Sequence, residues 1–218
     1  MNRLALFDCD GTLVDSQATI CRAMEEAFAG AGLESPGRPA IRRIVGLSLV
    51  PALAALLPEA EDAFHVRLAE DYKAAFFRLR SAGLAEEPLF EGIDEAIRTL
   101  DARGWLLGVA TGKSSRGLNH VLERHALKHH FVTLQTADHH PSKPHPAMIA
   151  AAMAEAGACP ETTAMIGDTS FDMAMAAAAG AHGVGVSWGY HAPEELTAAG
   201  ACVVAEHARA LPVHLEAL

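Results

Sequence analysis

The sequence has little of what marks a membrane protein, a nucleic-acid-binding protein or a disulfide-rich protein. No run of about 18 apolar residues occurs in the 218 residues, which argues against a membrane span. Basic residues are few: 17 Lys and Arg stand against 27 Asp and Glu, and the net charge of −10 argues against a nucleic-acid or acidic-membrane partner. The four cysteines lie far apart without CxxC spacing, which predicts reduced structural thiols rather than a metal site.

Aromatic residues are also scarce, at 6% of the chain, whereas hydrophobic residues make up 50%. This composition predicts a sizeable core built largely by close packing of alanine-rich helices. The first residues do not resemble a signal peptide, because their apolar run is short and breaks at Asp8. We therefore expect a cytoplasmic protein, and the sequence leaves open whether it is a monomer or a homodimer.

The opening stretch carries the strongest chemical signal. An apolar run of strand length, residues 4–7, ends in two carboxylates, Asp8 and Asp10, followed by the turn Gly11-Thr12. Carboxylates at positions i and i+2 project toward the same side where a strand ends, and open α/β sheets bind ligands at that edge. Two close carboxylates repel each other and favour a hard cation such as Mg²⁺. On this stretch alone an acidic turn is an equally good interpretation, since Asp-Gly is common turn chemistry.

The rest of the chain divides into two kinds of pattern. Residues 16–87 are predicted to be helical without strands, beginning with a helix that Ser16 is expected to cap. From Gly92 onward, helices alternate with apolar strands, which indicates a doubly wound parallel sheet. The strands are expected at 105–110, 131–135, 163–166, 183–186 and 202–204. The predicted fold is α/β, with a core of residues 1–15 and 88–218 and an inserted all-helical domain of residues 16–87.

Polar residues follow three of the predicted strands, including the opening one at residues 4–7, and should meet at one edge of the sheet. They are Asp8 with Asp10, Thr111 and Asp168. Each signal is weak alone: Thr111-Gly112 also fits a turn, and Asp168 and Asp172 also fit acidic residues at a helix N-terminus. Lys143-Pro144 by itself is an ordinary proline-rich loop.

Taken together and in this order, the segments resemble those of the haloacid dehalogenase-like (HAD) hydrolases over essentially the whole chain. The four segments are 8–16 (Asp-Cys-Asp-Gly-Thr-Leu-Val-Asp-Ser), Thr111-Gly112, Lys143-Pro144 and 167–172 (Gly-Asp-Thr-Ser-Phe-Asp). The helical block looks like that family's α-helical cap, and the chain looks most like the phosphoglycolate phosphatase and phosphoglucomutase-like branch. The resemblance implies a Rossmann-like core and a phosphatase for a small phosphorylated metabolite, of the phosphoglycolate or sugar phosphate type.

The resemblance also implies roles for the residues in these segments. Asp8, which is ionised at neutral pH, is expected to attack phosphorus, and Asp10 to act as general acid and then base. Mg²⁺ is expected to bind Asp8, Asp168 and the backbone carbonyl of Asp10. Thr111 and Gly112 are expected to bind the phosphate, as is Lys143, whose charge would also help catalysis. Asp172 is expected to orient Lys143 or a metal-bound water rather than to ligate the metal directly.

Three alternatives stay open at this point. An inorganic pyrophosphatase or a β-phosphoglucomutase-like phosphomutase would also keep both leading acids. The mutase pattern usually has a Tyr-His pair after the first segment and a hydrophobic residue at the place of Thr12, whereas this chain has Gln17-Ala18-Thr19-Ile20 there, which favours a phosphatase. A non-catalytic protein, either a phosphate or Mg²⁺ sensor or a partner-binding protein, is the third alternative.

Substrate specificity is expected in the helical block, where cationic side chains could clamp a second anionic group of the substrate. The candidates are Arg42, Arg43 and Lys73, although each also fits a solvated helix charge. The linkers near Ser16 and near 87–92 are expected to hinge this block over the core.

Overall fold

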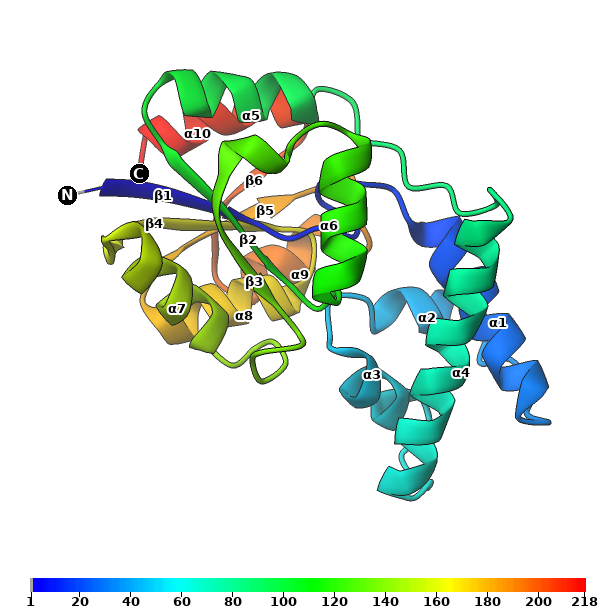
Figure 1. Cartoon of the computed structure of the whole chain (residues 1–218). Helices are drawn as coiled ribbons and strands as arrows, with labels where there is room; N and C mark the ends of the chain where they lie inside the picture. Colours follow the sequence, from blue (N-terminus) through cyan, green and yellow to red (C-terminus); the bar gives the residue numbers. More distant parts are fainter. Residues whose placement is uncertain (1) are drawn as a thin grey trace.

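The fold is a six-stranded parallel sheet with helices on both faces, as the computed structural model of residues 2–218 shows (Figure 1). The strand order is β3-β2-β1-β4-β5-β6, and every neighbouring pair is parallel. The strands are β1 (Asn2–Phe7), β2 (Leu106–Thr111), β3 (Phe131–Thr136), β4 (Ala158–Gly167), β5 (His182–Val186) and β6 (Ala201–Ala205). The predicted α/β class and doubly wound arrangement are therefore confirmed.

The core lies on both faces of the sheet, and β1 at its centre shows why. Strand β1 is flanked by β2 and β4, so a continuous apolar run is needed to fill both faces. Ala5 and Phe7 pack on one side with α5 (Ile93–Ala102), α6 (Ser115–Arg124) and α10 (Leu211–Glu216). Leu4 and Leu6 pack on the other side with α7 (Ala147–Ala156) and α8 (Ser170–Ala179).

The strand order changes direction between β1 and β4, while the strands themselves stay parallel. From β1 the sheet continues through β2 on one side and through β4 on the other, so the carboxyl ends of β1 and β4 are neighbours. Such a change of strand order opens a crevice in which α/β proteins bind their ligands. Asp8 follows β1 and Asp168 follows β4, and both therefore lie at this crevice.

Helices α1 to α4 lie between β1 and α5 and form a body beside the sheet (Figure 1). They are α1 (Gln17–Gly30), α2 (Arg38–Arg43), α3 (Leu49–Leu56) and α4 (Asp62–Ser81). They share an apolar core of their own, formed mainly by Met24, Phe28, Ile41, Leu53 and Leu68. This separate core favours the division at residues 16–87, which stays a prediction. Among the helices of residues 2–218, none is both long and apolar enough to cross a membrane.

The structure differs from the sequence-based expectations in three details. Ser16 precedes α1 but makes no capping hydrogen bond, because its hydroxyl donates to Asp10 Oδ1 at 2.6 Å. Strand β4 begins at Ala158, earlier than the expected residue 163. The sequence did not indicate its first half, because that half is too polar to show a strand pattern. A six-residue helix, α9 (Pro193–Ala198), was not expected, and its short length explains why no periodicity indicated it.

Short 3₁₀ turns complete the chain at η1 (Lys128–His130) and η2 (Ala208–Ala210). Cys9, between the two leading acids, is fully buried against the core. The cysteines are all free thiols, which agrees with the expectation of reduced residues.

Candidate active site

Asp8 is the first residue after β1 and is almost completely buried. Its Oδ1 lies 2.9 Å from the Nζ of Lys143, while its Oδ2 has no hydrogen-bond partner among residues 2–218. Burial raises the pKa of Asp8 to about 6, repulsion from Asp172 adds to this rise, and the ammonium of Lys143 opposes it. A buried carboxylate oxygen without a hydrogen-bond partner destabilises the fold, so this atom is suited to bind a ligand.

Asp168 follows β4 and is held by two hydrogen bonds. Thr12 Oγ1 donates to its Oδ1 at 2.8 Å, and the backbone N–H of Tyr190 donates to its Oδ2 at 2.9 Å. A Cβ at Gly189 would collide with the Asp168 side chain, so only glycine lets this loop close over the carboxylate. Burial, with repulsion from nearby acids, raises the pKa of Asp168 well above its ordinary value.

Asp172 lies in the first turn of α8 and belongs to a capping box. Thr169 and Asp172 exchange hydrogen bonds, with the Thr169 N–H donating to Asp172 Oδ2 at 3.0 Å. The other oxygen, Oδ1, accepts from Lys143 Nζ at 2.6 Å. Lys143 thus bridges Asp8 and Asp172, and its pKa is raised: burial alone would lower it, but the two carboxylates outweigh burial.

Carboxylate oxygens of Asp8, Asp168 and Asp172 lie within 4.8 Å of one another and form the acidic cluster of this site. All three donors are hard oxygens, and Asp8 Oδ2 has no partner within the described chain, so the cluster fits a small divalent cation. The family resemblance implied Asp8, Asp168 and the backbone carbonyl of Asp10 as ligands. Asp8 and Asp168 are together here, and the side chain of Asp10 lies outside the acidic cluster.

Thr111 and Gly112 end β2 at the same edge of the sheet. Thr111 is buried, and its hydroxyl oxygen accepts from the backbone N–H of Lys113 at 3.2 Å, which leaves the hydroxyl proton free to donate. A Cβ at Gly112 would come within 2.6 Å of the carbonyl oxygens of Gly46 and Leu47. Glycine at this position therefore permits the close approach of the helical body.

Asp10 sits in a buried charged group that the sequence did not indicate, which we call the Asp10 cluster. Its Oδ1 accepts from Ser16 Oγ at 2.6 Å and from Lys113 Nζ at 2.7 Å. Lys113 Nζ also lies 3.0 Å from Glu87 Oε1, and Glu87 Oε2 accepts from Arg80 at 2.9 Å. Ser16 and Glu87 lie in the two predicted linkers. One linker therefore contacts Asp10 directly, and the other contacts it through Lys113.

Arg43 and Ser48, on either side of the turn at Gly46, dock the helical body on the core through polar contacts. The Ser48 N–H donates to Ser142 Oγ at 2.8 Å, and Arg43 pairs with Glu195 at 2.6 Å. The ring nitrogen Nε2 of His191 lies 3.3 Å from the Arg43 carbonyl oxygen. These contacts hold the turn at Gly46, which precedes α3, directly over Thr169.

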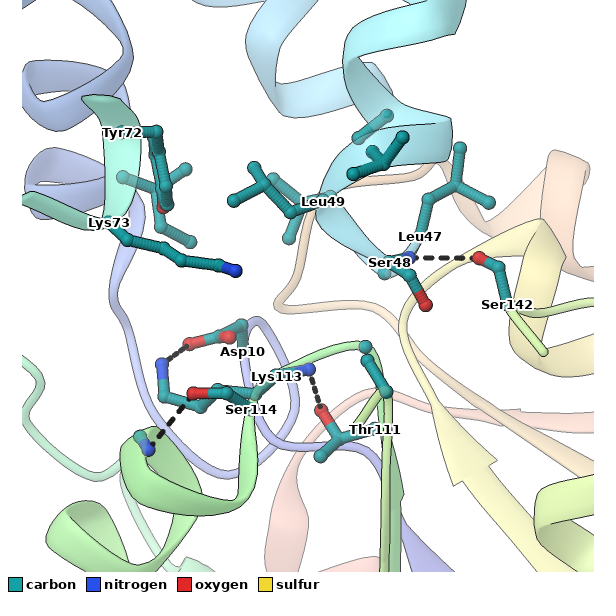
Figure 2. Close-up of a pocket in the computed structure, with 18 of the residues that line it drawn as sticks. Asp10, Leu47, Ser48, Leu49, Tyr72, Lys73, Thr111, Lys113, Ser114 and Ser142 are labelled. Atoms are coloured by element: carbon teal, nitrogen blue, oxygen red, sulfur yellow. Dashed lines mark hydrogen bonds and ion pairs between the residues drawn. The ribbon is translucent and has the colours of Figure 1, made fainter. Parts of the chain in front are cut away.

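A cavity of about 670 Å³ lies between this helical body and the strand ends. Asp8 lines the cavity. Asp10 and Thr111 line its core side (Figure 2). Of the three cationic candidates, only Lys73 lines the cavity, extending from α4 into the space above Asp10 (Figure 2).

The other two candidates are engaged elsewhere. Arg43 is bound to Glu195. Arg42 is bound by the Gln17 carboxamide, whose oxygen, turned toward the guanidinium, accepts at 2.9 and 3.0 Å.

Comparison with known proteins decides the family. The family model described as haloacid dehalogenase-like hydrolase matches residues 5–186. The chain is 38% identical to "Probable phosphatase IndB" of Dickeya dadantii, over 91% of this chain and 87% of that protein. The chain is a haloacid dehalogenase-like hydrolase. A hydrolase from Pseudomonas syringae has the same fold, with a TM-score of 0.87 and 29% identity, over 100% of this chain and 99% of the other.

A second relative of this haloacid dehalogenase-like hydrolase is the "Phosphoglycolate phosphatase" of Pseudomonas putida. It is 28% identical, over 96% of this chain and 78% of that protein. The predicted membership of this family, close to proteins of the phosphoglycolate phosphatase type, is confirmed.

Sequence reasoning missed several polar residues of this hydrolase's site. Lys113 directly follows Thr111-Gly112, so its place at a strand end was the available signal. Tyr190 follows β5, a further strand that ends at the same edge. Glu87 gave no signal, because its burial depends on contacts with Arg80 and Lys113 from other elements.

Proposed function

We propose that this haloacid dehalogenase-like hydrolase is a magnesium-dependent phosphatase for a small phosphorylated metabolite, of the phosphoglycolate or sugar phosphate type. The observation that carries the proposal is Asp8, whose unpartnered oxygen is buried between Lys143 and the acidic cluster. Relatives named phosphoglycolate phosphatase, 5'-nucleotidase and pyrophosphatase are 28–30% identical to the chain. These names share a phosphoryl group as the reacting part and differ in the leaving group, so they support the reaction more than any one substrate.

Asp8 is the nucleophile of the proposed reaction. With a pKa of about 6 it is mostly ionised at pH 7, so its free oxygen attacks phosphorus without a separate base. The bond between phosphorus and the leaving oxygen breaks, and an aspartyl phosphate forms. Water then attacks this acyl phosphate and releases inorganic phosphate and the free carboxylate of Asp8.

Asp10 is the proton donor and acceptor of the two steps. It gives a proton to the leaving oxygen in the first step and takes one from the attacking water in the second. Its carboxylate is held by Ser16 at 2.6 Å and Lys113 at 2.7 Å, which fixes its position. This anchoring is the arrangement that a proton-transfer group needs to keep a defined orientation.

The phosphate group is bound by the strand ends. The hydroxyl of Thr111 and the backbone of Gly112 provide donors, and Lys143 provides a positive charge next to Asp8. Mg²⁺ held by Asp8, Asp168 and the Asp10 carbonyl would neutralise the charge between carboxylate and phosphate. Asp172 orients Lys143 through its 2.6 Å ion pair and adds negative charge to the acidic cluster.

The experiment that tests the proposal is hydrolysis of a chromogenic aryl phosphate with Mg²⁺ and with EDTA. Wild-type turnover should depend on the metal, and Asp8→Asn should abolish turnover while circular dichroism stays unchanged. Asp15→Asn, in the same segment but exposed, is the matched control and should keep full activity. Unchanged activity in Asp8→Asn would refute the mechanism.

Two further measurements separate the alternatives. Absence of any metal-dependent signal in the wild type would favour a non-catalytic phosphate or Mg²⁺ sensor. Product analysis with a sugar monophosphate distinguishes release of phosphate from its transfer within the sugar, which would indicate a phosphomutase. Faster turnover of pyrophosphate than of any ester would indicate a pyrophosphatase.

A further inference from the structure

The cavity is much larger than a two-carbon phosphorylated acid requires. Its volume is about 670 Å³. Sites for ligands of drug or cofactor size have volumes of about 300–1,000 Å³. Phosphoglycolate bound at Thr111 and Lys143 would leave most of this space to water, and the enzyme would then lack the contacts that position its leaving group.

The wall of the cavity opposite the phosphate end is apolar. Met24 from α1, Leu49 and Val50 from α3, and Tyr72 and Phe76 from α4 line it. Figure 2 shows Leu49 facing the open space from the start of α3, with Tyr72 across from it on α4. Leu49 and Val50 are only half-buried in the free protein, so a ligand would remove further apolar area from water.

On this wall the cations already have acidic partners, whereas Arg116, on the core side of the cavity, stacks on Phe77 and has no ion pair among the described residues. Arg80 lines the cavity, but its charge is matched by Glu87 at 2.9 Å. Lys73 is exposed and lies 2.8 Å from Glu70. An anion transferred to an apolar wall without a dedicated partner would be destabilised, so a carboxylate beside the phosphate is poorly matched here.

Two neutral polar groups do face this space. Ser48 Oγ is buried without a hydrogen-bond partner in the described part of the chain, and its side chain points to the core side of the cavity (Figure 2). Burial raises the pKa of the Tyr72 phenol above its ordinary value, so its hydroxyl stays protonated and able to donate. An apolar wall with a few neutral hydrogen-bonding groups suits a heteroaromatic ring.

We propose that the wall of Met24, Leu49, Val50 and Tyr72 receives an aromatic ring of the leaving group, so that the substrate is a phosphomonoester of the nucleoside 5'-monophosphate class. The assignment rests on the proposed phosphatase function and narrows it within the small phosphorylated metabolites. Tyr72 then supplies a hydrogen bond to the polar edge of the ring, and Ser48, which points to the core side, supplies one to the part of the substrate between ring and phosphate.

The test compares kcat/KM of the full chain in Mg²⁺ for uridine 5'-monophosphate, glucose 6-phosphate, phosphoglycolate and acetyl phosphate. The leaving group of acetyl phosphate is very small, so its kcat/KM measures the phosphoryl chemistry without contacts to the apolar wall. We expect uridine 5'-monophosphate to exceed phosphoglycolate by about tenfold or more, since a few apolar contacts discriminate by roughly 10- to 200-fold.

A substitution in the wall gives the second readout. Leu49→Ala should lower the ratio of kcat/KM for uridine 5'-monophosphate to that for acetyl phosphate by about tenfold, mainly through KM. Leu56→Ala is the matched control, because Leu56 lies on the same helix and is half-buried but does not line the cavity. The ratio should be the same in Leu56→Ala as in the wild type.

The outcomes separate the two levels of the proposal. Phosphoglycolate or glucose 6-phosphate preferred over uridine 5'-monophosphate, with acetyl phosphate hydrolysed, overturns the ring assignment and leaves the phosphatase standing. An unchanged ratio in Leu49→Ala also overturns it. Hydrolysis of none of the four compounds overturns the phosphatase function and the ring assignment together.

Discussion

Lys113 Nζ lies 2.7 Å from Asp10 Oδ1 and joins that carboxylate to both linkers of the helical body. One linker contributes Ser16, which also binds Asp10, and the other contributes Glu87, 3.0 Å from the same ammonium. A movement of the helical body that shifts either linker therefore acts directly on the proposed proton donor. The pKa of Lys113 is raised: burial alone would lower it, but Asp10 and Glu87 outweigh burial, so this amine stays charged.

Lys113→Met should weaken catalysis most where the leaving group needs a proton. Without the ammonium, Asp10 loses its anchor, and we expect kcat for an alkyl phosphate to fall about 100-fold, the usual size of a general acid contribution. An aryl phosphate, whose leaving group departs as a stabilised anion, should lose much less. Steady-state kinetics on both substrates, at a temperature where circular dichroism shows a folded protein, measures the difference.

Lys128→Met is the control for this substitution, because Lys128 is exposed on η1 and pairs only with Glu123. It should leave kcat unchanged on both substrates. An equal loss on alkyl and aryl phosphates in Lys113→Met would show that Lys113 does not act through the proton transfer of Asp10.

Glu87→Gln should destabilise the protein in a pH-dependent way. Burial would raise the pKa of Glu87, but Lys113 and Arg80 outweigh burial and lower the pKa below its ordinary value. The stabilisation is therefore complete above the unfolded pKa of about 4.3 and is lost as the pH falls through the lower folded pKa. At pH 7 the substitution should reduce the free energy of unfolding by about 3 kcal/mol, as measured by urea denaturation.

The difference between Glu87→Gln and wild type should shrink as the pH is lowered below about 4.3, where the unfolded Glu is protonated. Glu70→Gln removes an exposed pair with Lys73 and should change stability by less than about 1 kcal/mol at any pH. A difference for Glu87→Gln that is the same at pH 7 and in acid would mean that the ion pairs do not stabilise the fold.

The sheet and its acidic residues could be predicted because their signals are local. An apolar run that ends in acid, as at Asp8, gives both a buried strand and the position of its functional group. The same holds for Thr111 and Asp168, which end β2 and β4. The change of strand order between β1 and β4 then brings these strand ends together without any further information from the side chains.

The cation assignments could not be made in this way, because they depend on distant partners. Arg43 pairs with Glu195, which lies 152 residues away in sequence, and so points away from the cavity that it was expected to line. Ser16 has the sequence features of a helix cap, but Asp10 binds its hydroxyl instead. Lys73 alone of the three cationic candidates lines the cavity, and its position along α4 gave no reason to choose it over the others.

Gly112→Ala should impair closure of the helical body without unfolding the protein. The added Cβ would lie 2.6 Å from the carbonyl oxygens of Gly46 and Leu47, so the body must move outward. A displacement of about 1 Å lowers rates by roughly 100-fold, and we expect a loss of that size in kcat/KM. The melting temperature should change little, since alanine also restricts the unfolded chain.

Gly30→Ala is the matched control, because no atom lies within 4 Å of a Cβ added at that helix end. It should keep wild-type kinetics. Wild-type kinetics in Gly112→Ala as well would show that the contact of Gly112 with the Gly46-Leu47 turn is not needed for turnover.

Compared with the wild type, Asp168→Asn should be more stable without Mg²⁺ and less stable with it. Without metal, the acidic cluster holds buried carboxylates within 4.8 Å, and burial makes the charged form of Asp168 costly. Asparagine removes that cost, so the metal-free melting temperature should rise by a few degrees. With Mg²⁺ at 100 times its Kd, the wild type should gain about 2.7 kcal/mol of stability and the variant little or none.

Differential scanning calorimetry with EDTA and with Mg²⁺ measures all four states, and Asp15→Asn, an exposed acid outside the acidic cluster, is the control. Asp15→Asn should respond to Mg²⁺ as the wild type does. Equal stabilisation of wild type and Asp168→Asn by Mg²⁺ would place the ion away from Asp168. A metal-free melting temperature that falls in Asp168→Asn would show that the hydrogen bonds from Thr12 and Tyr190 outweigh the cost of the buried charge.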